Sequence, residues 1–173
     1  ENLLFFDKKP VEAGIKETII FYNDNDTYDY KKSRDLCDYR SAVICLPNNF
    51  GTDDYDEGLI RITFIANFDQ WNALDRKTYL QKKKEVCNAA LSLVAKVIPQ
   101  FQAKLLYHDV FTPKTINRFT GHFKGAVYGT TEKVRDGRTG IKNLFICGTD
   151  QGFLGIVGAM LSGITIANRY LLK

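Results

Sequence analysis

Residues 144–159 read Leu-Phe-Ile-Cys-Gly-Thr-Asp-Gln-Gly-Phe-Leu-Gly-Ile-Val-Gly-Ala. The apolar run 144–147 is typical of a short buried strand, a glycine-bearing turn follows it, and the apolar residues of 153–172 predict a helix. In an α/β sheet this order places a helix N-terminus at the carboxyl end of a strand, where ligands bind. Free N–H groups and the helix dipole favour negative charge there, and glycines let a flat ligand approach the backbone.

The spacing of small residues within this helix has two interpretations. Gly155, Ala159 and Gly163 recur every four residues and so share one helix face. The stripe either lets the helix press against a cofactor or packs closely on a neighbouring strand, and spacing alone favours the packing interpretation. The chain contains no G-x-G-x-x-G motif, so it does not cradle a pyrophosphate in the Rossmann manner.

The remaining pattern predicts strands and one long helix. Hydrophobic residues recur at helical spacing across 75–98 until Pro99 ends the pattern. A long polar and glycine-bearing stretch, 112–140, is typical of a loop that carries ligand contacts. The predicted strands are 18–22, 41–46, 59–67 and 104–107.

Composition limits the classes of function. A chain of 173 residues with 45% hydrophobic content forms one core, and a net charge of +4 is too small to indicate a nucleic-acid partner. The four cysteines lack metal-binding spacing, neither histidine has a partner at catalytic spacing, and no metal site is expected. Free thiols and the absence of a signal peptide predict an intracellular location, cytoplasmic or peripheral to a membrane. The apolar stretch of about 15 residues at 153–167 is too short for a span and favours a buried helix.

Several motifs occur in the order typical of one enzyme group. The chain resembles the phytoene desaturase and retinol saturase group of FAD oxidoreductases, and it is most similar to the retinol saturase branch. It departs from the desaturase branch, which has a Pro-Gly-x-Gly turn where this chain has Gly-Phe-Leu-Gly at 152–155. The resemblance runs from about Ser41 to the C-terminus. Its motifs are Gly-x-Asp at 148–150, Gly-x-x-Gly-Ala at 155–159, Thr-Pro-x-Thr at 112–115, Gly-Ala-x-Tyr-Gly at 125–129, and Trp71 followed by Tyr79 and Lys83.

The resemblance implies an α+β fold, an α/β fragment of a larger enzyme. Residues 1–140 would form a mixed β-sheet substrate domain with flanking helices and a return segment. Residues 141–173 would form the closing strand–helix of an FAD-binding domain. The opening dinucleotide motif of the family is absent, and the chain starts with Glu1 rather than methionine. We therefore expect a C-terminal fragment whose partner, the N-terminal FAD-binding half, is missing.

The resemblance also implies a function and a set of cofactor contacts. The whole enzyme would use FAD to saturate or desaturate carbon–carbon double bonds of an apolar, isoprenoid or polyene-like lipid. This segment alone would be inactive and would bind FAD weakly or not at all. Asp150 would accept a hydrogen bond from a flavin ribityl or ribose hydroxyl or, equally, cap the last helix. The expected cofactor contacts are Gly148, Asp150, Gly152, Gly155, Ile156 and Tyr128, and no residue is assigned as a catalytic acid, base or nucleophile.

Alternatives remain open at this point. Tyr128 and Gly129 line either the flavin face or a substrate tunnel, or they form a simple turn. The same residues would serve a redox-neutral, flavin-dependent carotenoid-type isomerase. A third interpretation is a stand-alone lipid-binding or interaction module without catalysis. Further expected partners are a membrane surface and a second copy of the chain, since the last helix would expose an apolar face.

Overall fold

The computed structural model describes residues 1–27, 33–51 and 56–172. The strands are β1 (Asn2–Phe6), β2 (Ile19–Asn23), β3 (Cys37–Cys45), β4 (Gly58–Ala66) and β5 (Leu105–Val110). The α-helices are α1 (Phe68–Asn72), α2 (Arg76–Val97), α3 (Pro113–Thr120) and α4 (Gly155–Ile166). Short 3-10 turns lie at Pro10–Ala13, Pro47–Phe50, Phe123–Gly125 and Thr149–Gln151, and a π-helical turn, Ala167–Leu171, extends α4.

The strands form one five-stranded sheet in the order β2-β3-β4-β1-β5. All four neighbouring pairs are antiparallel, so the α+β class is confirmed, while the expected mixing of parallel and antiparallel strands is wrong. β1 lies between β4 and β5, with Leu4 opposite both Ile60 and His108. The sequence pattern missed this strand because its apolar residues run without alternation.

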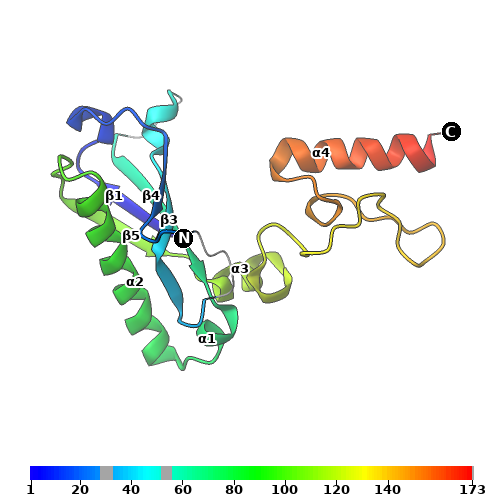
Figure 1. Cartoon of the computed structure of the whole chain (residues 1–173), viewed down its shortest axis with the longest axis horizontal. Helices are drawn as coiled ribbons and strands as arrows, with labels where there is room; N and C mark the ends of the chain where they lie inside the picture. The colour runs from blue at the N-terminus through cyan, green and yellow to red at the C-terminus, as the bar shows by residue number, and fades with distance from the viewer. Residues whose placement is uncertain (28–32, 52–55, 173) are drawn as a thin grey trace.

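The helix α2 covers one face of the sheet (Figure 1). Asp75 starts it by accepting hydrogen bonds from the N–H groups of Lys77 and Thr78, and the predicted helix 75–98 is confirmed. Its buried residues Val86, Ala90 and Val94 recur every four positions and therefore share one face. They pack in the core with the alternate residues of β1 and β4 that point the same way, including Leu4, Phe6, Ile60 and Ile62.

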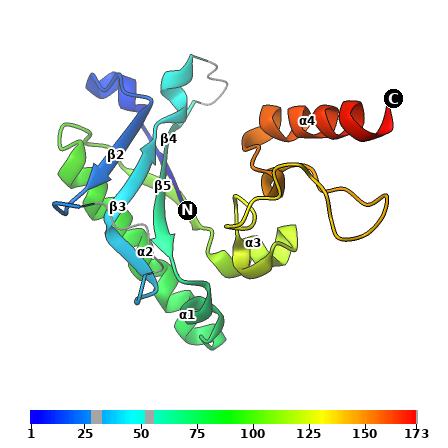
Figure 2. The ribbon, with the colours of Figure 1, turned by 45° about the vertical axis from the view of Figure 1, so that its right-hand side comes forward.

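The face of the sheet that lies away from α2 is only partly covered by other parts of the chain. Figure 2 shows the strands β2, β3 and β4 of this sheet. Residues directly opposite on neighbouring strands share a face, and the register gives two such rows here. One row runs through Ile19, Cys45, Arg61 and Leu3, and the other through Phe21, Val43 and Thr63. Phe21 is 80% exposed. We call this side of the sheet the open face.

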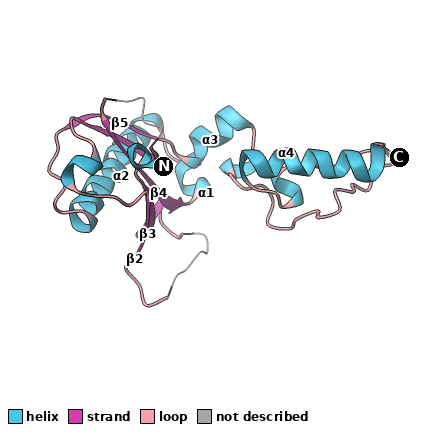
Figure 3. Cartoon of the chain, turned by 90° about the horizontal axis from the view of Figure 1, so that it is seen from above, coloured by secondary structure: helices cyan, strands magenta, loops and turns pink. Residues whose placement is uncertain are grey.

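The C-terminal part of the chain extends away from the sheet (Figure 3). The helix α3 lies at the junction, and α4 forms an arm beyond it. The predicted strand 144–147 is wrong: Phe145 makes one isolated bridge to Arg138, and the Ile146 N–H donates to Gly137 O at 2.7 Å. A strand requires a neighbouring strand for its backbone groups, and none of the described segments provides one. The division at residue 141 stays a prediction.

The arm carries α4 with its apolar outer face exposed, contrary to the expectation of a buried helix. Ile156, Val157 and Met160 are 83%, 70% and 64% exposed. The inner face is held by polar contacts: the Ser162 hydroxyl accepts a hydrogen bond from Gly148 N at 2.6 Å and donates one to Gln151 Oε1. None of the helices in the described ranges is long and apolar enough to cross a membrane.

Candidate functional site

Two of the sequence motifs meet at Tyr79 on α2. Its hydroxyl lies 3.0 Å from Thr112 Oγ1 and 3.2 Å from Thr115 Oγ1. Its ring packs edge-on against Trp71 at 5.6 Å between centroids, and Trp71 Nε1 donates to Leu36 O. The Trp-and-Tyr motif and the Thr-Pro-x-Thr motif therefore form one contact cluster.

The Thr-Pro-x-Thr motif begins helix α3. Thr112 is almost fully buried, and its hydroxyl accepts a hydrogen bond from Thr115 N at 3.2 Å. Pro113 occupies the first helical position, where its missing N–H costs nothing. The stretch 112–140 is thus not all loop. The loop prediction is wrong at Pro113–Thr120, where a threonine N-cap followed by proline is a helix-start signal.

Lys83 connects α2 to the last strand. Its ammonium lies 2.9 Å from Asp109 Oδ1 on β5. Burial raises the pKa of Asp109, but hydrogen bonds from Lys83 and from the Val110 N–H outweigh it and leave that pKa below its ordinary value. The pair fixes the edge of the sheet against α2, close to the point where the chain turns into α3.

Gly125 brings the next motif against the start of α3. It has a φ of 67°, and a Cβ added to it would lie only 2.2 Å from the carbonyl oxygen of Pro113. Any larger residue would push the 123–128 segment off this helix start. Position 125 therefore requires glycine for two reasons: its φ is positive, and a side chain there would collide with the carbonyl oxygen of Pro113.

Gly129 and Asp150 connect the two glycine motifs. The Thr130 N–H donates to Asp150 Oδ1 at 2.7 Å, and a Cβ on Gly129 would lie 2.3 Å from the same oxygen. The Lys133 ammonium donates both to Tyr128 O and to Thr149 O. The structure therefore places the predicted contacts Tyr128 and Asp150 on adjacent, hydrogen-bonded segments.

Asp150 does not cap α4, so this alternative is wrong. The N-cap position is Leu154, and no side chain caps the helix there. One carboxylate oxygen of Asp150 is held by Thr130, while the other has no hydrogen-bond partner within the described part of the chain. That second oxygen can accept a hydrogen bond from a ligand hydroxyl.

The glycine turn before α4 is open on its outer side. Gly148, Gly152 and Gly155 all have positive φ values, of 89°, 107° and 73°. A Cβ added to Gly148 or Gly155 would meet nothing within 4 Å, and Ile156 is 83% exposed. An uncapped helix start beside open glycines can bind a flat ligand that carries negative charge. The small-residue stripe packs on no described strand, since Gly155 and Ala159 are exposed.

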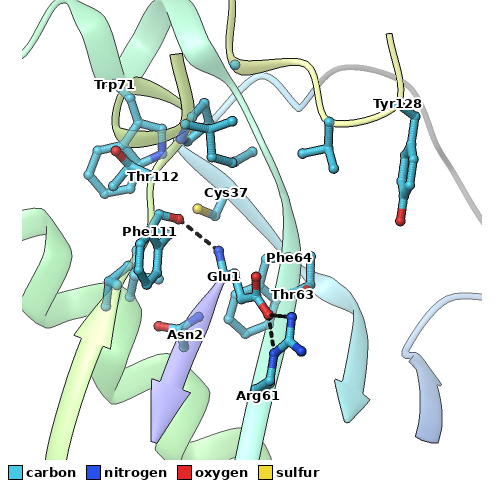
Figure 4. A pocket seen from close by; sticks show the side chains of 17 residues that line it. Glu1, Asn2, Cys37, Arg61, Thr63, Phe64, Trp71, Phe111, Thr112 and Tyr128 are labelled. Atoms are coloured by element: carbon cyan, nitrogen blue, oxygen red, sulfur yellow. Dashed lines mark hydrogen bonds and ion pairs between the residues drawn. The ribbon is translucent and has the colours of Figure 1, made fainter. Parts of the chain in front are cut away.

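A cavity of about 360 Å³ lies between the sheet, α1 and α3 (Figure 4). Its lining includes Trp71 and Thr112 from the motif cluster, Arg61 and Thr63 from β4, and Tyr128. A second, more apolar hollow of about 600 Å³ lies along the open face, and Thr63 and Tyr128 line both. Tyr128 therefore lies where the two cavities meet.

The first cavity contains a charged pair and a thiol. Arg61 forms an ion pair with Glu1 at 2.5 Å, and both side chains are labelled in Figure 4. Burial raises the pKa of the Cys37 thiol to about 11, so it stays protonated and unreactive at neutral pH. We missed Arg61 and Thr63 at the sequence level, although the alternation of β4 places both on the open face.

Comparison with known proteins identifies relatives. The chain is 26% identical over 142 residues to "Prolycopene isomerase 1, chloroplastic" of an Oncidium hybrid cultivar, covering 76% of this chain and 24% of that protein. It is 30% identical over 122 residues to "All-trans-retinol 13,14-reductase" of Danio rerio, covering 60% of this chain and 20% of that protein. "Prolycopene isomerase, chloroplastic" of Daucus carota is 25% identical over 143 residues, covering 76% of this chain and 23% of that protein. No protein-family model and no solved structure matches.

The resemblance predicted from the motifs is confirmed: the chain is a distant relative of these isomerases and of this reductase. The match spans about a quarter of the length of the relatives.

Proposed function

We propose that this chain is the C-terminal part of an FAD-dependent oxidoreductase that saturates or desaturates carbon–carbon double bonds of an isoprenoid or polyene-like lipid. One observation carries the proposal: the open glycine turn before α4 is hydrogen-bonded, through Asp150 and Lys133, to the segment that places Tyr128 beside both cavities. A redox cofactor and an apolar substrate must approach each other closely. Two sites joined in this way suit that requirement.

The residues around the glycine turn would hold the flavin. The free oxygen of Asp150 would accept a hydroxyl hydrogen bond, and the N–H groups at the start of α4 would face negative charge. Gly148 and Gly155 would permit close approach of the ring system, with Gly152 shaping the turn and Ile156 contacting the outer edge. When bound, FAD supplies the hydride chemistry, and the protein positions it.

The open face of the sheet would bind the lipid. Its rows are largely apolar, and the larger hollow is lined by Phe21, Val43 and Phe64, among others. Burying apolar surface contributes about 25 cal/mol per Å², so an extended hydrocarbon gains affinity along such a wall. Tyr128, at the meeting point of the cavities, would lie between the lipid and the flavin.

The test uses a longer protein that contains this chain behind a strand–GxGxxG–helix unit. We expect purified protein to show flavin absorption bands, and the 173-residue chain alone to bind FAD weakly or not at all. Ile156→Asp should lower flavin content strongly, because it places negative charge at the helix start. Met160→Asp, one turn further on and also exposed, is the matched control and should retain the flavin. A folded longer protein without flavin bands, even after addition of FAD, refutes the proposal.

A redox-neutral isomerase is a second candidate, favoured by the prolycopene isomerases among the relatives. The same residues would serve it, because a reduced flavin can act without net electron transfer. Mass spectrometry of the product separates the two activities. Isomerisation leaves the substrate mass unchanged, whereas saturation or desaturation changes it by two hydrogen atoms.

A further inference from the structure

A third hollow, of about 210 Å³, lies between the start of α2 and the outer side of α3. Three cationic side chains line it: Arg76 from the first turn of α2, and Lys114 and Arg118 from α3. The hydroxyl-bearing residues Tyr79 and Thr115 also line it. We call this hollow the basic pocket. It is separate from the glycine turn and from the open face of the sheet.

The positive charge of the basic pocket is not neutralised by the described part of the protein. No carboxylate among the described residues forms an ion pair with any of the three cations. No acidic residue lines the hollow. The nearest acid in sequence, Asp75, is already occupied with the N–H groups of Lys77 and Thr78 at the start of α2. Like charges repel, so an anion binding among these cations would relieve that repulsion.

Two of the cations lie near aromatic rings. Lys114 and Arg118 are four residues apart and therefore project from the same side of α3. The Lys114 ammonium lies 5.7 Å from the centre of the Tyr79 ring, and the Arg118 guanidinium lies 5.7 Å from the centre of the Phe119 ring. The contact with the partly buried Tyr79 ring restricts the Lys114 side chain without neutralising its charge. A pre-ordered set of donors loses less entropy on binding a ligand.

From these observations we infer that the basic pocket binds the phosphate group of a phosphate monoester. Two guanidinium groups and one ammonium group together match the several acceptor oxygens of a dianionic phosphate. The volume lies below the roughly 300–1,000 Å³ of pockets for drug-sized ligands, which suits a single phosphate rather than a whole dinucleotide. Phe119, 77% exposed at the rim, offers apolar surface to an attached acyl chain. The rim therefore favours a lipid phosphate over free phosphate.

The experiment titrates the 173-residue chain by calorimetry, at constant ionic strength, with dihexanoyl phosphatidic acid, dihexanoyl phosphatidylcholine and inorganic phosphate. We expect saturable binding of phosphatidic acid and little binding of phosphatidylcholine, whose phosphate is a diester masked by a cation. The double variant Lys114→Gln, Arg118→Gln should weaken phosphatidic acid binding about tenfold or more, as expected for loss of charge-assisted hydrogen bonds. The matched control Lys104→Gln, Arg169→Gln removes the same charge far from α3 and should bind as the unaltered chain does.

Further arms identify the source of the phosphate and guard against misfolding. Phosphatidic acid binding much more tightly than inorganic phosphate, with that advantage lost in Phe119→Ser, indicates a lipid headgroup. Equal affinities for phosphatidic acid and inorganic phosphate indicate that the pocket binds free phosphate. Arg118→Gln alone, whose described contact is only with Phe119, keeps the test valid if the double variant unfolds. Absence of saturable binding by any phosphate, or equal weakening in the two double variants, overturns the inference and leaves the proposed function untouched.

Discussion

The contact between Gly125 and Pro113 can be tested with a matched pair of substitutions. Gly125 and Gly121 lie in the same connection after α3 and have nearly the same conformation, with φ values of 67° and 71°. They differ in their surroundings. A Cβ on Gly125 would lie 2.2 Å from Pro113 O, whereas a Cβ on Gly121 would meet nothing within 4 Å.

The two alanine variants should therefore differ in stability. A left-handed conformation costs a residue with a side chain about 1–2 kcal/mol, and both variants carry this cost. Gly125→Ala must in addition move a backbone carbonyl, and overpacking of this kind adds about 1–3 kcal/mol. We expect a loss of about 2–5 kcal/mol for Gly125→Ala and about 1–2 kcal/mol for Gly121→Ala.

Urea unfolding followed by tryptophan fluorescence measures the difference. Trp71 is the single tryptophan, is 1% exposed, and lines the same cavity as Gly125. The free energy of unfolding follows from linear extrapolation, provided that the slope is unchanged between variants. Equal losses for the two alanines would show that Gly125 is required for its φ alone, and the contact with Pro113 would lose its role in positioning Tyr128.

Three further predictions concern the rest of the molecule. Tyr79→Phe removes hydrogen bonds to two threonine hydroxyls and should lower the free energy of unfolding by about 1–2 kcal/mol, while Tyr107→Phe, at an exposed ring, should change it by less than about 0.5 kcal/mol. Because burial raises the pKa of Cys37 to about 11 from 9.0 in the unfolded chain, the unfolded state loses its proton first as pH rises. Cys37 should therefore lower the free energy of unfolding by about 2–3 kcal/mol between about pH 9 and 11, and urea titrations of Cys37→Ala should show a flatter pH profile. Ile156→Ser should reduce self-association of the chain in sedimentation velocity, because it removes the most exposed apolar side chain of α4; an unchanged distribution would exclude the α4 face as the contact.

The sequence predicted those elements whose signals are local. The helix 75–98 carries its periodicity, its Asp75 cap and its terminating proline within one stretch, and α2 follows it within a residue at each end. The strand 59–67 was recognisable from its β-branched and aromatic residues, and β4 agrees with it. Both elements could be predicted without knowing which residues they pack against.

Errors arose where the deciding contacts are distant in sequence. β1 pairs with β4 and β5, so Leu4 faces Ile60 and His108, and nothing near Leu4 encodes those partners. The run 144–147 has strand-like composition but no neighbouring strand among the described segments. Composition reports only that a segment can form a strand, whereas the hydrogen bonds depend on a partner.

The candidate site was predictable as a set of residues but not as an arrangement. The motifs named Tyr128 and Asp150 separately. Their proximity depends on Gly129, where the space for Asp150 Oδ1 exists only because no Cβ is present. Whether these residues and the glycines of the turn contact a flavin stays a prediction.

The structure explains why several weak motifs appear together in order. Tyr79 fixes the threonine cap of α3, the first turn of α3 accommodates Gly125, and the segment after Gly125 leads through Gly129 to Asp150. At Gly125 and Gly129 an added Cβ would lie 2.2 Å from Pro113 O and 2.3 Å from Asp150 Oδ1, so a larger residue at either position displaces its neighbour. The motifs are therefore parts of one connected path from the helix on the sheet to the turn before α4. Its mechanical consequence is that a displacement of the segment that carries Tyr128 also disturbs the hydrogen bonds at Thr149 and Asp150.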